Sequence, residues 1–255
     1  AGDRDHTIQI DFAKPLSKAL SIEAGTKAIL RSNYSDYHVD DRYNPNNPYA
    51  TNDTLTNNFT YHQDIYSVYN SYQLKMDKWT GKAGLRLEHT ALSADFTSVG
   101  ETIAPSYNNL IPSISIQRSF KSSSLNFGYT QRIQRPGIFQ LNPFTDKSNP
   151  TFINIGNPAL KPELDNTFEL TYSNFSKGSI NVGLSYAFSD NAIQNVSSLH
   201  QIRVNDTLET VTYTTFENLG SNKTLGFNVH TNMNLTKKFT LGLNGQVNHV
   251  WLKGK

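Results

Sequence analysis

Three segments in the last third of the chain alternate apolar and polar residues with strict period two. In residues 179–189, "SINVGLSYAFS", isoleucine, valine, leucine, tyrosine and phenylalanine alternate with small residues such as serine, asparagine and glycine. The same alternation recurs in residues 224–235 and 239–248. Because successive side chains of a strand point to opposite faces of a sheet, this period predicts strands with one apolar and one polar face.

Weaker versions of the same pattern run through the rest of the chain and predict seven more strands. They lie at residues 6–12, 20–37, 59–74, 79–94, 110–118, 124–133 and 164–175. No segment has the 3.6-residue period of an amphipathic helix. The sequence therefore predicts an all-β chain of about ten strands.

The connections between these strands alternate in length. Short turns are predicted at residues 13–19, 75–78, 119–123, 176–178 and 236–238, and long connections at 38–58, 95–109, 134–163 and about 190–220. Strict alternation places all short turns at one end of the sheet and all long loops at the other, as an antiparallel up-and-down topology requires.

The polar face distinguishes a membrane barrel from a soluble sandwich. The three clearest strands contain no Asp, Glu, Lys or Arg, although 17% of the whole chain is charged. A soluble sandwich normally exposes charged residues on its outer face, whereas Asn, Gly, Ser and Thr suit a wet barrel interior. Five aromatic residues also lie next to the short turns, as in an interfacial girdle: Phe12, Trp79, Phe120, Phe175 and Phe239. We therefore expect part of a transmembrane β-barrel.

Several functional classes are disfavoured by composition. The formal net charge is +2 without a Lys/Arg cluster, so no nucleic-acid partner is expected. The chain has no Cys, and its seven His show no metal-ligand spacing, so no catalytic, cofactor-binding or metal-binding residues are predicted. The carboxylates of Asp36, Asp40 and Asp41 are interpreted as a solvated acidic loop, with a Ca²⁺ site as the alternative, and Arg86 and Glu88 are expected to pair on one face of their strand.

Residues 135–166 hold five of the ten prolines. Proline lacks an N–H, so this segment is predicted to form a rigid extended loop without ladder strands. Asn142 and Asn157 are expected to hydrogen-bond nearby backbone, and Gly156 to adopt a positive φ. The loop is expected to brace adjacent strands; the alternative is that it narrows the lumen or contacts ligand.

The same segment resembles the signature of the TonB-dependent outer-membrane receptors, in particular the large barrel family common in Bacteroidetes. The signature-loop residues are Arg135, Pro136, Asn142, Pro143, Gly156, Asn157 and Pro158. The matching text is "NNLIPSISIQRSF" at 108–120, "LNFGYTQRIQRPGIFQLNPF" at 125–144 and "GNPALKPELDNTFELTYSNF" at 156–175. Supporting matches are "GKAGLRLEHT" at 81–90 and "FENLGSNKTLGFNV" at 216–229.

This resemblance implies a barrel of about 22 strands with an N-terminal plug, which imports a scarce nutrient by coupling to TonB. Residues 1–255 would be part of that one barrel domain, with the plug and the TonB-contacting region missing from this stretch. The implied partners are outer-membrane lipid, the TonB complex and an unknown small ligand such as a siderophore, glycan or peptide. The implied location is the outer membrane of a Gram-negative bacterium.

Residue roles in binding are weaker expectations. Tyr43 and Tyr49 in the 38–58 loop are candidates for ligand contact, and Asn228, Asn232 and Asn244 are expected to face the lumen. Two alternatives remain open at this point. One is a soluble β-rich module that binds carbohydrate or another ligand through loop tyrosines, and the other is an outer-membrane barrel without TonB coupling.

Overall fold

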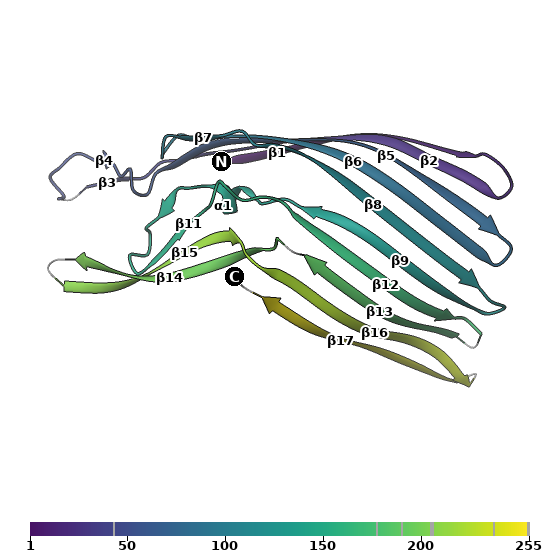
Figure 1. The fold of residues 1–255 in the computed structure, drawn as a ribbon. Coiled ribbons are helices and arrows are strands. Elements are labelled where there is room, and N and C mark those ends of the chain that lie inside the picture. The colour runs from purple at the N-terminus through teal and green to yellow at the C-terminus, as the bar shows by residue number, and fades with distance from the viewer. Residues whose placement is uncertain (43, 177, 190, 205–206, 237, 254–255) are drawn as a thin grey trace.

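Ten long antiparallel strands form one continuous curved wall (Figure 1). The computed structural model describes residues 1–42, 44–176, 178–189, 191–204, 207–236 and 238–253. The strands are β1 (Gly2–Pro15), β2 (Leu20–Tyr37), β5 (Asn57–Met76), β6 (Trp79–Phe96), β8 (Ser106–Ser119), β9 (Ser123–Gln134), β12 (Glu163–Asn174), β13 (Gly178–Ser189), β16 (Ser221–Thr236) and β17 (Phe239–Lys253). They are hydrogen-bonded in this order, so the predicted ten-stranded up-and-down topology is confirmed.

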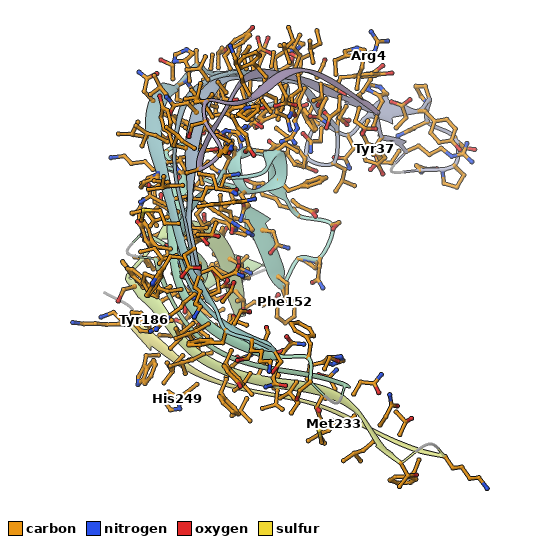
Figure 2. All side chains as sticks on the ribbon, turned by 90° about the vertical axis from the view of Figure 1, so that its right-hand side faces the viewer. Arg4, Tyr37, Phe152, Tyr186, Met233 and His249 are labelled. Atoms are coloured by element: carbon orange, nitrogen blue, oxygen red, sulfur yellow. The ribbon has the colours of Figure 1, made fainter. Side chains whose placement is uncertain are left out.

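The short and long connections separate to opposite ends of the wall, as predicted. Figure 1 shows the tight turns together at one end, here called the turn end, and the long connections at the other, the loop end. Figure 2 shows that the wall curves strongly, with Phe152 on its concave side and Tyr186 on its convex side. Five of the aromatic side chains near the turns are exposed: Phe12, Trp79, Phe120, Phe175 and Phe239.

The apolar face of the wall changes side within the N-terminal strands. In β6, Leu85 and Leu87 are exposed on the convex face, whereas Leu92 and Phe96, nearer the loop end, are buried on the concave face. The phase changes around His89, which lies opposite Tyr66 in β5. An apolar convex face suits lipid and an exposed polar one suits water, so this reversal predicts that the membrane-spanning part of β5 and β6 ends at this level. The remaining residues of both strands would then form a wall beyond the membrane.

The partner strand repeats this reversal. Val68 and Leu74 of β5 are exposed, whereas Phe59, Tyr61 and Ile65 are buried. Above the membrane, the buried side chains of both strands pack against the 135–166 segment. This loop-end cluster consists of Phe59, Tyr61, Leu92, Ala94, Phe96, Leu141 and Leu160.

The long connections contain more regular structure than the sequence predicted. They hold β3 (Asp40–Asp41), β4 (Ala50–Thr51), β7 (Glu101–Ile103), α1 (Ile138–Leu141), β10 (Thr145–Asp146), β11 (Phe152–Ile155), β14 (Ile193–Val204) and β15 (Thr207–Asn218). Four of these strands form a separate sheet in the order β10-β11-β15-β14. β14 and β15 make a long hairpin where an irregular connection was expected, and β11 pairs with β15 in parallel.

The prediction that the proline-rich segment contains no ladder strand is therefore wrong. All five prolines lie outside α1, β10 and β11: one precedes α1, two lie between these elements and two follow β11. The intervening residues keep their N–H groups, so short strands and one helical turn fit between the prolines. In the described part of the chain, no helix is long and apolar enough to cross a bilayer.

Candidate functional site

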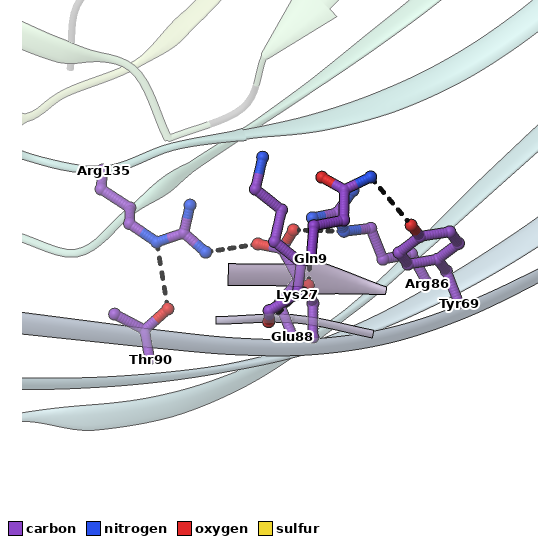
Figure 3. Close-up of polar contacts among 8 residues, drawn as sticks. Gln9, Lys27, Tyr69, Arg86, Glu88, Thr90 and Arg135 are labelled. Carbon is purple, nitrogen blue, oxygen red and sulfur yellow. Dashed lines mark hydrogen bonds and ion pairs between the residues drawn. The ribbon is translucent and has the colours of Figure 1, made fainter. Parts of the chain in front are cut away.

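The proline-rich segment is fixed to the concave face at its first residue. Arg135 donates from Nε to Thr90 Oγ1 at 3.0 Å and from Nη2 to Glu88 Oε2 (Figure 3). Thr90 is fully buried, and the Glu88 side chain is only 8% exposed. Charge-assisted contacts of this kind are strong when they are shielded from water, so Arg135 anchors the segment to β6.

Glu88 also pairs with Arg86 on its own strand, as predicted. Arg86 Nε lies 2.7 Å from Glu88 Oε1, but the N–H is not directed at that oxygen, so the contact is an ion pair without a hydrogen bond. The Arg86 guanidinium donates instead to Ser67 Oγ at 3.1 Å and lies 5.3 Å from the centre of the Tyr69 ring. One buried carboxylate thus bridges two arginines, of which sequence reasoning identified only Arg86.

Two asparagines shape the segment beyond this anchor, as predicted. Asn142 Oδ1 accepts the Phe144 N–H at 2.9 Å, and Asn157 Oδ1 accepts the Ala159 N–H at 2.9 Å. Asn157 Nδ2 also donates to the Phe216 carbonyl of β15 at 2.9 Å. The segment is therefore tied both to itself and to the long hairpin.

The expected role of Gly156 is wrong. Gly156 does not adopt a positive φ; among the described glycines only Gly100, Gly178 and Gly220 do. Its N–H instead donates to the Asn142 carbonyl at 2.9 Å, and a Cβ on Gly156 would lie 2.3 Å from that oxygen. Glycine is needed here because two backbones approach closely, which removes the space for any side chain.

A cavity of about 590 Å³ lies at the loop end, between the proline-rich segment, the first long connection and the β14–β15 hairpin. Its size lies within the range of about 300–1,000 Å³ that is typical of small-molecule sites. The lining residues are Tyr37, Val39, Leu55, Asn57, Phe139, Asn142, Phe144, Asp146, Ser148, Asn154, Ile155, Gly156, Asn195, Thr214 and Phe216. Aromatic rings and side-chain amides dominate this lining, so the cavity offers stacking surfaces together with hydrogen-bond donors and acceptors.

The signature-loop positions surround the cavity unevenly. Asn142 and Gly156 line it. Pro136 is buried beside the arginine anchor, and Pro143 and Pro158 are half-buried. The segment thus braces the wall and also lines the cavity.

The tyrosines predicted to contact ligand do not lie in this cavity. Tyr49 is exposed outside it, with the Arg42 guanidinium 4.9 Å from its ring centre. Tyr43 lies outside the described residues. The sequence analysis did not identify Phe139, Phe144 and Phe216 as lining residues. Phe139 and Phe144 could have been noticed, because they lie between the signature prolines, outside any predicted strand.

Asn228, Asn232 and Asn244 share one face of the C-terminal strands. Asn228 opposes Gly183, and a Cβ on that glycine would lie 2.3 Å from Asn228 Oδ1. Asn244 opposes His230, two positions from both Asn228 and Asn232. Tyr186 lies on the convex side (Figure 2), and Gly183, three positions away in the same strand, points to the opposite face, so these amides line the concave side.

No resident metal ion is indicated by the described side chains. The carboxylates of Asp40 and Asp41 accept hydrogen bonds from Thr51 and Asn52, which satisfies part of their acceptor capacity. The described residues contain no group of three or more acidic or histidine side chains placed to hold a metal.

Comparison with known proteins gives consistent results. The model of the family "Outer membrane protein beta-barrel family" matches residues 1–255. No curated protein matches the sequence. Among solved structures, the fold is similar to the FrpB iron transporter from Neisseria meningitidis, with a TM-score of 0.65, 12% identity, and coverage of 98% of this chain and 36% of that one.

Two further structures share the fold. The ferric enterobactin receptor from Pseudomonas aeruginosa has a TM-score of 0.66 at 16% identity, with coverage of 95% of this chain and 35% of the receptor. The copper transporter OprC has a TM-score of 0.67 at 12% identity, with coverage of 99% and 38%. At these identities the comparison establishes the fold, and the chain spans little more than a third of each transporter.

Proposed function

Because the chain belongs to the outer membrane protein beta-barrel family and lies in the outer membrane of a Gram-negative bacterium, we propose that it forms part of a transporter for a scarce nutrient. Residues 1–255 would be ten strands of one barrel domain of about 22 strands, the number that encloses a plugged lumen. The rest of the full-length protein would supply the other strands, the plug and the contact with TonB, and the long connections would face the cell exterior.

The observation that carries this proposal is the division of the wall into two faces. The convex face exposes a band of leucine, isoleucine, valine and aromatic side chains, whereas the concave face of β13 and β17 is polar from the middle of these strands to the turn end. A wall of this kind separates lipid from a hydrated lumen. Ligand would enter at the loop-end cavity and pass along the face that Asn228, Asn232 and Asn244 line, when the plug moves.

The wall argues against one of the two alternatives, the soluble binding module, and is compatible with the other, an outer-membrane barrel without TonB coupling. A soluble binding module would leave the convex apolar band in water, where large apolar patches promote aggregation, and family membership also opposes this reading. An outer-membrane barrel without TonB coupling has the same wall, so only the energy dependence of uptake distinguishes it from the proposed transporter.

Uptake by intact cells tests the proposal. Cells with and without the full-length protein would be given labelled ferric siderophores, copper, oligosaccharides and peptides, with and without a protonophore. We expect one ligand class to accumulate only when the protein is present and the proton gradient is intact. Accumulation that survives the protonophore would refute TonB coupling, and equal uptake of every class without the protein would refute transport.

A further inference from the structure

We infer that the loop-end cavity binds an uncharged, hydroxyl-rich ligand, a neutral oligosaccharide, rather than an anionic metal chelate. This inference rests on the proposed transport function and names the substrate class for it. It depends on three observations: the charge of the cavity lining, the chemistry of its side chains and the charge of the concave wall below it.

The cavity lining has no cation to neutralise an anion. None of its described lining residues is Lys or Arg, and the one carboxylic acid among them is Asp146. An anionic ligand would lose hydration and meet a carboxylate in this space, which opposes binding. The absence of cations does not reduce the affinity for a neutral ligand, because such a ligand carries no charge to be neutralised.

The side chains match the two surfaces of a sugar ring. A pyranose has an apolar face of C–H groups and a rim of hydroxyls that both donate and accept hydrogen bonds. Phe139 is 81% exposed, so its ring is free to stack on such a face. Asn57, Asn154 and Asn195 each carry a donor and an acceptor for the hydroxyl rim.

The charge of the wall below the cavity also favours a neutral ligand over an anion. On the concave face of β13, β16 and β17, the described residues include Ser185, Asn228, Gln246 and their neighbours, and none is Asp, Glu, Lys or Arg. The adjacent strand β12 adds a carboxylate to this face at Glu169, which opposes Ser185. A path of amides and hydroxyls with an added acid passes neutral ligands more readily than anions.

Four arginines and lysines of the described chain form ion pairs with carboxylates. Arg31 pairs with Asp5 at 3.2 Å, and Lys82 pairs with Glu23 at 2.6 Å. Arg86 and Arg135 share Glu88, as described above. Three carboxylates thus offset three of these four positive charges, which weakens the attraction for an anionic chelate.

Binding measurements on the purified full-length protein test the inference. The probes are linear neutral gluco-, xylo- and manno-oligosaccharides, a ferric catecholate siderophore and a short neutral peptide, each titrated calorimetrically at low and at high salt. We expect one oligosaccharide series to bind with an affinity that does not change with salt. Phe139→Ala should weaken that binding about tenfold or more, as for an aromatic anchor in a binding site. The matched control is Phe152→Ala, because Phe152 is also an exposed phenylalanine of the segment but does not line the cavity.

The outcomes separate this inference from the proposed function. If the ferric catecholate or the peptide binds and no oligosaccharide does, the inference is overturned, whereas import of that probe would leave the transport function standing. Equal losses in Phe139→Ala and Phe152→Ala would overturn the placement of the site. Oligosaccharide binding that is lost in Phe139→Ala but kept in Phe152→Ala supports the inference. Import that continues in the presence of a protonophore would refute TonB coupling and would leave this inference unchanged.

Discussion

Glu88 of β6 and Arg135 of the proline-rich segment form an ion pair across 47 positions of sequence, and this pair joins the membrane wall to the segment that covers it. The pair lies below the loop-end cluster, and Glu88 also contacts Arg86. Two guanidinium groups therefore share the single negative charge of Glu88, whose side chain is only 8% exposed.

Replacing Glu88 should cost more stability than replacing Arg135. Glu88→Ala leaves two arginines facing each other without a counter-charge, which we expect to lower the free energy of unfolding by about 3 kcal/mol. Arg135→Ala leaves Glu88 paired with Arg86 and should cost about 1.5 kcal/mol. Urea denaturation of the full-length protein in detergent, followed by the gel-mobility shift between folded and unfolded barrels, measures both values.

An exposed pair serves as the control for these variants. Glu23 and Lys82 approach to 2.6 Å, but their side chains are 50% and 40% exposed. Glu23→Ala should therefore cost less than about 1 kcal/mol. Equal losses in Glu88→Ala and Glu23→Ala would show that burial does not strengthen the Glu88 pairs.

Gly156→Ala should disrupt the proline-rich segment. The added Cβ would lie 2.3 Å from the Asn142 carbonyl oxygen, so the two backbones must separate and their hydrogen bond must break. We expect a loss of about 2 kcal/mol or more and faster proteolysis of the segment. Gly137→Ala is the matched control, because its new Cβ would meet nothing nearer than 3.9 Å. A variant Gly156→Ala with unchanged proteolysis would contradict the close approach.

The long strands could be predicted from the sequence because their side chains face two uniform environments. Lipid on one side and water on the other impose period two over a whole strand, as in β13. The strands β10, β11 and β15 could not be predicted in this way. Their partners come from distant parts of the chain, such as Phe152 opposite Thr212, so no local pattern specifies the pairing.

The site shows a similar limit. The Arg86–Glu88 pair could be predicted because side chains two positions apart in a strand point to the same face of the sheet. Arg135 joins the pair only because the proline-rich segment turns inward, which is a tertiary feature. The phase change between Leu87 and Leu92 is visible in the sequence, since an odd spacing moves the apolar residues to the other face, but an interrupted period by itself predicts only a weaker strand.

That phase change predicts where lipid ends on the convex face. Leu87→Arg places a charge in the apolar band, which we expect to cost about 2 kcal/mol or more. Ser93→Arg puts the same side chain on the same face of β6, exposed above the level of His89, and should change stability by less than about 0.5 kcal/mol. Folding yield into lipid vesicles, read from gel mobility, compares the two variants. Similar losses at both positions would show that lipid reaches beyond the His89 level.

Stability at high pH should depend on Tyr61, which lies in the loop-end part of β5 outside the membrane. Burial in the loop-end cluster, together with the nearby Tyr107, raises the pKa of Tyr61 from 10.0 to about 12. The folded state then keeps the proton that the unfolded state releases above pH 10, so this contribution to stability is complete below pH 10 and is lost as pH rises through about 12.

The expected slope in that interval is a loss of about 1.4 kcal/mol for each pH unit beyond the loss shared with other groups. Tyr61→Phe removes the titrating hydroxyl together with the hydrogen bond that Gln63 Nε2 donates to it at 2.9 Å. The variant should therefore be less stable than the wild type at pH 8, by about 1 kcal/mol, and the difference should shrink and reverse between pH 10 and 12.

Urea midpoints measured across this range test the sign of the difference. Tyr49→Phe, which alters an exposed ring, is the control and should parallel the wild type. A constant difference between Tyr61→Phe and the wild type at every pH would show that the phenol of Tyr61 does not titrate differently in the folded and unfolded states.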